Sequence, residues 1–315
     1  TAMTDSTASK FYHFKVLLNE FFLDKKKIRS TTDLVKMASH CELKPGVDYA
    51  QFHQLYDVAE AALNEFMGNQ DIPAFIRNAM VYLQSYAQLL PTFTERSSDK
   101  SLFQQFSTPQ DIAWVLIQLA NIKIDDWVLE PSAGTGSISS LLKKSLANRI
   151  IVNEIHPFRN WLLTEQAYHN IFREDAAQIH NLPKFRELVP DKIIMNPPFS
   201  RTIQTKAKVD VLAGSKHLLS SYKLLKKGGR LILLINASFN KGSRGYTFFQ
   251  QNAPDHHLVM NATIDPETFK QKGTHFETRI MVIEKNPEKK IHIPHAEINE
   301  DNISEILELN RYNHG

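Results

Sequence analysis

Hydrophobic residues in the first third of the chain recur at the spacing of an α-helix. The pattern covers residues 11–23, 49–67 and 74–90, where apolar side chains repeat every three or four positions. Only Gly46 and Gly68 precede Gly134, and a long stretch with so few glycines is typical of helices. We therefore expect a helical N-terminal domain over residues 1–95, ending in a polar linker near residues 91–101.

The pattern changes after residue 100 to short apolar runs separated by helical stretches. The β-type runs are residues 127–130, 150–153, 192–195, 231–236 and 279–283, and the helical stretches are 137–146, 158–168 and 213–225. Strands that alternate with helices predict an α/β fold. We expect a Rossmann-like, doubly wound sheet over residues 96–290 and a C-terminal tail over 291–315. Ligands of such sheets bind at the carboxyl ends of the strands.

Composition narrows the class of protein. The 315 residues include one cysteine, Cys41, which excludes an internal disulfide and a multi-cysteine zinc site and suits a reducing cytoplasm. No apolar run approaches the roughly 20 residues that cross a bilayer, so we expect a cytoplasmic protein with no membrane partner. The histidines do not form a His-Glu-x-x-His pattern, and we expect no metal site.

Charge is more informative locally than over the whole chain. The net charge of +3 is too small to predict a polyanionic partner. Residues 192–244, however, contain eleven Lys or Arg and a single acid, Asp210. Such a block is either a solvated face or a surface that contacts phosphates.

A glycine turn follows the first β-type run. Its residues are Glu130, Pro131, Ser132, Ala133, Gly134, Thr135 and Gly136. Glycines allow a cofactor to approach the backbone, and the helix that follows offers free N–H groups. Ser139 replaces the third glycine of the dinucleotide fingerprint, and no Gly-Lys-Ser/Thr follows. An acid at the strand end would repel a pyrophosphate but suits an ammonium group, which favours S-adenosylmethionine over NAD.

Acids also follow the next two strands. Glu154, with Ile155 beside it, lies just after the second strand and can accept both hydroxyls of a ribose. Asp175, followed by Ala176, lies near the end of the third strand and can accept a hydrogen bond from the adenine amine of the cofactor. The alternatives are a surface glutamate and an aspartate that caps a loop or helix.

The most specific pattern is Asn196, Pro197, Pro198 and Phe199, directly after the strand at 192–195. Two prolines fix the backbone and remove two N–H donors. The side-chain oxygen of Asn196 and the carbonyl of Pro197 can then both accept hydrogen bonds from one NH2 group, while Phe199 offers a flat face for a planar ring. The alternative is a rigid turn with a phenylalanine in the core.

These residues resemble the signature of S-adenosylmethionine-dependent amino-methyltransferases, particularly the N6-adenine DNA enzymes. Phe106, Ser107 and Thr108, before Pro109, resemble the family's early cofactor motif, in which the threonine contacts the methionine end of the cofactor. The resemblance implies that Asn196 also lies at the cofactor. The order of motifs over residues 100–285 is closest to the methyltransferase module of phage and plasmid antirestriction proteins of the strawberry-notch type.

The same resemblance implies a set of substrate contacts. Residues 267–280 resemble the later motif whose aromatic side chain closes over a flipped base, and Phe269 is the expected partner of Phe199, with Phe276 as the alternative. Ser200 and Arg201, which follow the signature, are expected beside the substrate as well. Both phenylalanines at 269 and 276 can instead belong to the core.

The sequence therefore predicts methyl transfer from S-adenosylmethionine to N6 of a flipped adenine in DNA. Asn196 is an amide and cannot act as a general base, so its role is to accept hydrogen bonds from the amine. Two alternatives stay open: the same chemistry on an NH2 group in RNA or on a protein glutamine, and a non-catalytic scaffold that only binds the cofactor. DNA is the expected partner, with a possible protein partner bound through the N-terminal helices.

Overall fold

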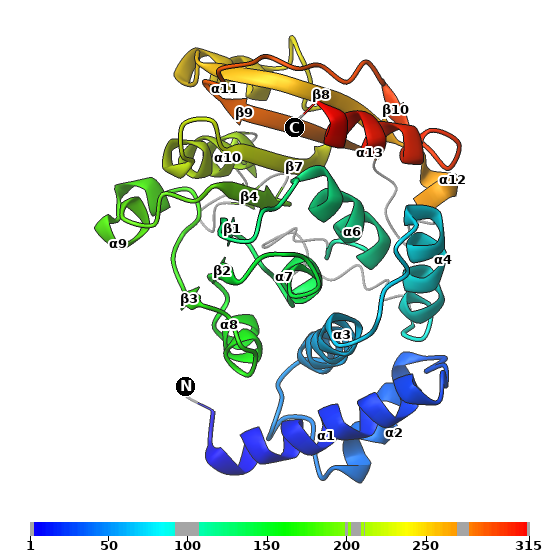
Figure 1. The fold of residues 1–315 in the computed structure, drawn as a ribbon. Coiled ribbons are helices and arrows are strands. Elements are labelled where there is room, and N and C mark those ends of the chain that lie inside the picture. Colours follow the sequence, from blue (N-terminus) through cyan, green and yellow to red (C-terminus); the bar gives the residue numbers. More distant parts are fainter. Residues whose placement is uncertain are drawn as a thin grey trace.

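The computed structural model describes residues 3–91, 107–198, 201–202, 209–210, 212–269 and 277–313, with the backbone alone at 201–202 and 209–210. Its first part is helical, as the sequence predicts (Figure 1). The N-terminal helices are α1 (Asp5–Leu23), α2 (Thr31–His40), α3 (Phe52–Gly68) and α4 (Ile76–Ala87). The side chains of Thr4 and Ser30 cap the first two by accepting hydrogen bonds from the backbone N–H groups of Thr7 and Asp33.

Strands and helices alternate in the rest of the chain. The helices are α6 (Gln110–Leu119), α7 (Ser137–Leu142), α8 (Pro157–Thr164), η1 (Ile179–Asn181), α9 (Pro183–Arg186), α10 (Ala213–Leu224), α11 (Arg244–Asn252), α12 (Pro266–Phe269) and α13 (Ile303–Tyr312). The strands are β1 (Trp127–Glu130), β2 (Arg149–Asn153), β3 (Asn170–Phe172), β4 (Lys192–Met195), β5 (Arg201–Thr202), β6 (Val209–Asp210), β7 (Arg230–Asn236), β8 (His256–Ile264), β9 (Thr278–Lys285) and β10 (Glu297–Ile298).

Eight of the described strands form one sheet in the order β10-β8-β9-β7-β4-β1-β2-β3. Only β9 runs antiparallel to its neighbours, β7 and β8, and the remaining pairs are parallel. The strand order reverses at β1, which lies between β4 and β2. A doubly wound sheet binds its ligands outside the carboxyl ends of the strands at such a reversal. The predicted Rossmann-like α/β class is confirmed.

Alternate side chains of each strand enter two separate cores. In β1 and β7, Val128 and Ile232 face one core, while Leu129 and Leu231 face the other. The first core is covered by α6, α7 and the N-terminal helices, and the second by η1, α9, α10 and α11. Burial on both faces explains why these strands read as continuous apolar runs.

The N-terminal helices form layers on the first face of the sheet. α3 packs against α7 and α8, α4 packs against α6, and α1 and α2 pack against α3 (Figure 1). A Cβ atom at Gly68 would lie 2.6 Å from the carbonyl oxygen of Ser140, so the glycine allows α3 to approach α7 closely. The helices and the sheet share one continuous core, which extends from Phe11 to Leu307.

The segment predicted as a C-terminal tail is part of the fold. It forms β10 at the edge of the sheet and helix α13, whose Ile303, Ile306 and Leu307 are buried. Asn310 of this helix accepts a hydrogen bond at 2.6 Å from Arg230, which has 0% exposure and is paired with Glu284 at 2.7 Å. A hydrogen bond to a buried charge pair of the sheet therefore anchors this helix.

Candidate functional site

The predicted motifs meet at the carboxyl ends of β1, β2 and β4. These three strands are neighbours and parallel, so Glu130, Asn153 and Met195 end at the same edge. Asn153 links the segments that follow β1 and β3 at this edge. Its side chain donates to the carbonyl oxygens of Pro131 (3.0 Å) and Glu174 (2.9 Å) and accepts from the N–H of Glu174 (2.9 Å).

The glycine turn has the geometry that the sequence predicts. Gly134 and Gly136 have φ values of 57° and 92°, in the left-handed region that favours glycine. The N–H of Ala133 donates to the carbonyl oxygen of Asn153 at 2.9 Å, and Gly136 is the N-cap of helix α7. A Cβ atom on Gly134 would meet nothing within 4 Å, so the turn faces open space. A ligand can therefore approach the backbone at Gly134.

Glu154 supports this turn from β2. Its Oε2 accepts a hydrogen bond from the N–H of Gly134 at 2.7 Å, and its Oε1 accepts from the N–H of His156 at 2.8 Å. The side chain has 0% exposure, and this burial raises the pKa of the carboxyl although Arg159 acts to lower it. The contact of Glu154 with ribose stays a prediction. It would use the second lone pair of oxygens that already accept hydrogen bonds from backbone N–H groups.

Glu130 is the second buried acid, with 2% exposure. Burial raises its pKa well above the ordinary value, even though the polar groups of Ser139 act to lower it. Its Oε2 is buried and has no hydrogen-bond partner. An unsatisfied buried carboxylate oxygen is costly, and a cation with N–H donors would satisfy it. The acceptor oxygens of Glu130 therefore fit an ammonium group better than a phosphate.

Thr108 and Asn196 join the early motif to the signature after β4. The side-chain nitrogen of Asn196 donates to the hydroxyl of Thr108 at 3.0 Å. Asn196 is half-buried, whereas Pro197 and Pro198 are buried. A Cβ atom at Gly214 would lie 3.2 Å from the carbonyl oxygen of Pro198, so that carbonyl faces α10. Thr108 therefore holds the amide nitrogen of Asn196, and Pro197 follows directly in sequence.

The residues after β2 and β3 take mixed positions. Ile155 is 38% exposed, which is unusual for its type and leaves an apolar surface beside Glu154. Asp175 is half-buried, and its Oδ1 accepts a hydrogen bond from the N–H of Ala177 at 3.0 Å. It therefore caps a turn, as the alternative interpretation predicts, and its contact with adenine stays a prediction. Ala176 is buried below it.

The structure does not describe the side chains of several residues that were expected at the cofactor or the substrate. Phe106, Phe199, Ser200 and Phe276 lie outside the described residues, and Arg201 is described by its backbone alone, in β5. Phe269 ends α12 with 1% exposure and belongs to the first core. This position matches its alternative as a core residue, because a stacking platform needs an exposed face.

Three cations of the basic block do not face the glycine turn. Lys192 and Arg230 are buried inside the sheet, where Arg230 pairs with Glu284. Lys226 pairs with Asp191 at 3.1 Å. All three lie at the amino ends of β4 and β7, away from the motifs, so the interpretation of the block as a surface that contacts phosphates does not hold for them.

Helix α3 contributes side chains that the sequence did not reveal. Asp57 accepts a hydrogen bond from Arg159 at 3.1 Å. Glu60 accepts hydrogen bonds from the hydroxyls of Ser107 and Thr135. Three polar residues at helical spacing, in a helix otherwise rich in buried apolar residues, were the available signal: Asp57, Glu60 and Asn64.

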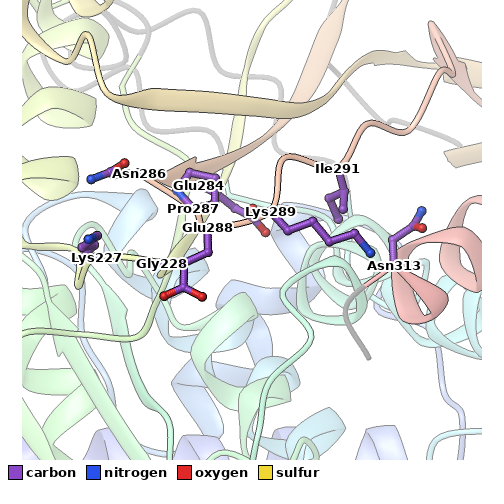
Figure 2. Close-up of a pocket in the computed structure, with 9 residues that line it drawn as sticks. All are labelled: Lys227, Gly228, Glu284, Asn286, Pro287, Glu288, Lys289, Ile291 and Asn313. Atoms are coloured by element: carbon purple, nitrogen blue, oxygen red, sulfur yellow. The ribbon is translucent and has the colours of Figure 1, made fainter.

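A separate cavity of about 390 Å³ lies away from these motifs (Figure 2). Gly228, just before β7, and Glu284, near the end of the antiparallel β9, are among its lining residues. It is therefore at the amino ends of the parallel strands, opposite the glycine turn. In the described ranges, no group of three or more His, Cys, Asp or Glu side chains can hold a metal ion, and no helix is long and apolar enough to cross a membrane.

Comparison with known proteins gives one sequence relative and several similar structures. No protein-family model matches the chain. The ribosomal RNA small subunit methyltransferase A of Hydrogenobaculum sp. (strain Y04AAS1) is 28% identical over 137 residues, which are 42% of this chain and 52% of that protein. The chain thus matches about half the length of this relative.

Among solved structures, the DrdV–DNA complex is similar over 96% of this chain and 38% of its own, with a TM-score of 0.52 and 13% identity. A putative class I S-adenosylmethionine-dependent methyltransferase from Listeria monocytogenes covers 97% of this chain and 99% of its own, with a TM-score of 0.49 and 14% identity. A modification subunit of a putative type I restriction enzyme from Vibrio vulnificus covers 74% and 58%, with a TM-score of 0.47 and 12% identity.

Proposed function

We propose that the chain transfers a methyl group from S-adenosylmethionine to the exocyclic N6 amine of adenine in DNA, with the base flipped out of the duplex. The hydrogen bond between Asn196 and Thr108 carries this proposal. It connects the two motifs through the amide nitrogen, and in the proposed reaction the amide oxygen accepts from the substrate amine. Side chains 88 residues apart in sequence thereby meet at the edge where the sheet binds ligands.

The site residues fit the cofactor. The open glycine turn allows close approach at Gly134, the unsatisfied oxygen of Glu130 suits an ammonium, and exposed Ile155 suits an adenine ring. The bound cofactor supplies an electrophilic methyl group on a sulfonium. The chain therefore has to position the acceptor in line with that methyl group, rather than activate a leaving group.

Two acceptors make the substrate amine a better nucleophile. An adenine amine is weakly nucleophilic because its lone pair is delocalised into the ring. Hydrogen bonds from its two hydrogens to Asn196 Oδ1 and to the Pro197 carbonyl oxygen would favour tetrahedral nitrogen and stabilise the positive charge that develops on it. Neither group takes the proton at neutral pH, so it leaves to solvent after transfer.

The substrate class rests on separate support. The similarity to a DNA complex, DrdV, favours DNA, and extrusion of the base costs a few kcal/mol in a duplex. The sequence relative acts on ribosomal RNA, which favours adenine in RNA as a second candidate. Both substrates present the same planar amine to Asn196 and Pro197.

In the test, the purified protein is incubated with radiolabelled S-adenosylmethionine. Duplex DNA, single-stranded DNA, ribosomal RNA and a protein mixture are offered as acceptors in parallel. We expect label in DNA at N6 of adenine. Asn196→Ala should lower kcat by about 10²- to 10³-fold, the usual loss when one polar contact to developing charge is removed. Asn252→Ala, an exposed position at the end of α11, is the matched control and should keep full activity.

The acceptors separate the candidates. Label that enters RNA in preference to DNA would move the proposal to RNA. An unchanged rate of methyl transfer in Asn196→Ala would show that the amide takes no part in the reaction. Cofactor binding without transfer to any acceptor would indicate a scaffold.

A further inference from the structure

Helix α3 turns a row of polar side chains toward the glycine turn. Asp57, Glu60 and Asn64 follow one another at intervals of three and four residues, so they lie on one face of the helix. Asn64 donates to the carbonyl oxygen of Thr135 at 3.3 Å and to its hydroxyl at 3.2 Å. This face of an N-terminal helix is therefore a wall of the site at β1.

Glu60 occupies the centre of this wall. It accepts hydrogen bonds from the hydroxyls of Ser107, before α6, and Thr135, in the glycine turn. Both bonds go to Oε1, and no described residue donates to Oε2. The side chain is half-buried, in contrast to the enclosed carboxylates of Glu130 and Glu154. Glu60 is thus the acid of this site with an oxygen that a ligand can reach.

The order of the strands separates the residues that would hold each part of the cofactor. Asn196, after β4, would lie at the reactive methyl group. Ile155 and Asp175, after β2 and β3, would hold the adenosyl part. Thr135 and Glu60, on the side of β1 and α3, would then be left for the amino-acid arm.

The charges of the site favour a cation there. Asp57, Glu60, Glu130 and Glu154 lie around the turn. Arg159 bonds to Asp57 and acts electrostatically on Glu60 and Glu154 as well. Burial raises the pKa of Glu60, even though Ser107 and Thr135 donate to it, because removal from water disfavours the charged form. A positively charged group beside Glu60 would offset this cost.

We propose that Glu60 of α3 is a cofactor-binding residue whose carboxylate receives the ammonium group of the cofactor's amino-acid arm. The inference rests on the proposed function, since it assumes the same cofactor. It makes the N-terminal helices part of the cofactor site itself, in addition to any partner they bind.

Two ligands that differ only in this arm test the proposal by calorimetry. S-adenosylhomocysteine has the amino-acid arm, whereas 5′-methylthioadenosine keeps the adenosine and the sulfur but lacks the amino acid. Glu60→Gln should weaken binding of S-adenosylhomocysteine by about 10- to 100-fold, the loss typical of a hydrogen bond to a charged group. Binding of 5′-methylthioadenosine should stay within about twofold of wild type, within the range of small context effects.

The outcomes distinguish this inference from the proposed function. If the wild-type chain binds neither ligand, the proposed function fails. If wild type binds both and Glu60→Gln weakens both equally, or weakens neither, Glu60 does not bind the ammonium while the proposed function stands. Glu20→Gln, the same change at an exposed position of α1, is the matched control and should leave both affinities unchanged.

Discussion

One added methyl group at Gly68 should disturb the proposed cofactor site from a distance. This glycine ends α3, and its Cβ position lies 2.6 Å from the backbone oxygen of Ser140 in α7. Ordinary contact begins at 3.4 Å, so Gly68→Ala requires the two helices to separate locally by about 0.8 Å. A backbone atom cannot change rotamer to avoid the clash, so the helices themselves have to move.

The competing terms determine the sign of the effect. Alanine favours a helix over glycine by at most about 1 kcal/mol, and less in the last turn. Overpacking of a close contact costs about 1–3 kcal/mol. We therefore expect Gly68→Ala to lower the free energy of unfolding by about 1 kcal/mol, and to lower Tm by about 2–4 °C.

The same movement should weaken ligand binding. The bonds from Asn64 to Thr135 are already 3.2 and 3.3 Å long, and a separation of about 0.8 Å would exceed hydrogen-bond range. Calorimetry with S-adenosylhomocysteine should show weaker binding, together with the lower Tm in a thermal melt. Asn69→Ala, the exposed neighbour, is the control for helix propensity and should change neither. A Gly68→Ala protein with wild-type affinity and a raised Tm would refute the close approach of α3 to α7.

Three further changes test other parts of the structure. Glu284→Leu should destabilise the fold by about 3–5 kcal/mol in urea unfolding, because it leaves Arg230 charged and buried. The double variant Arg230→Met/Glu284→Leu should recover most of this loss. A single variant as stable as wild type would contradict the buried pair. The raised pKa of Glu130 means that the ligand-free fold binds this proton more tightly than the unfolded chain, so the free energy of unfolding should fall as pH rises above the ordinary value of 4.5. Glu130→Gln should make that fall smaller in chemical denaturation across pH, and an unchanged slope would exclude the effect. Thr108→Val removes the hydroxyl that holds Asn196 and should lower kcat, whereas Thr108→Ser keeps a hydroxyl and should retain kcat. Equal activity of both variants in the methylation assay would show that the hydroxyl is not needed.

The sequence predicted the centre of the sheet well and its edges poorly. β1 and β4 have the predicted bounds because both faces of these strands are buried, which leaves a continuous apolar run. β3 has three half-buried residues and gives no such run. β10 is only two residues long, which is too short for a recognisable pattern. α13 was predicted as part of a tail, because its apolar residues are buried only through packing on the rest of the fold.

The candidate site divides in the same way. The residues of the glycine turn and Asn196 were visible because each follows a strand in a short, specific pattern, and such patterns are local. Glu60 was not visible, because its partners Ser107 and Thr135 lie 47 and 75 residues further along the chain. Contacts at such separations depend on how α3 packs on α7, and hydrophobic spacing does not specify that packing.

The position of α3 also changes how the chain's organisation is understood. The boundary near residue 95 stays a prediction, but the helices before it and the sheet after it share a core. Leu55, Val58 and Ala62 are buried in α3, and the polar face of that helix forms a wall of the glycine turn. A separate domain would need its own core and its own polar surface. α3 instead uses its apolar residues to stabilise the sheet, and its polar face lies against the glycine turn. The stability of the fold and the proposed cofactor site therefore depend on the same helix.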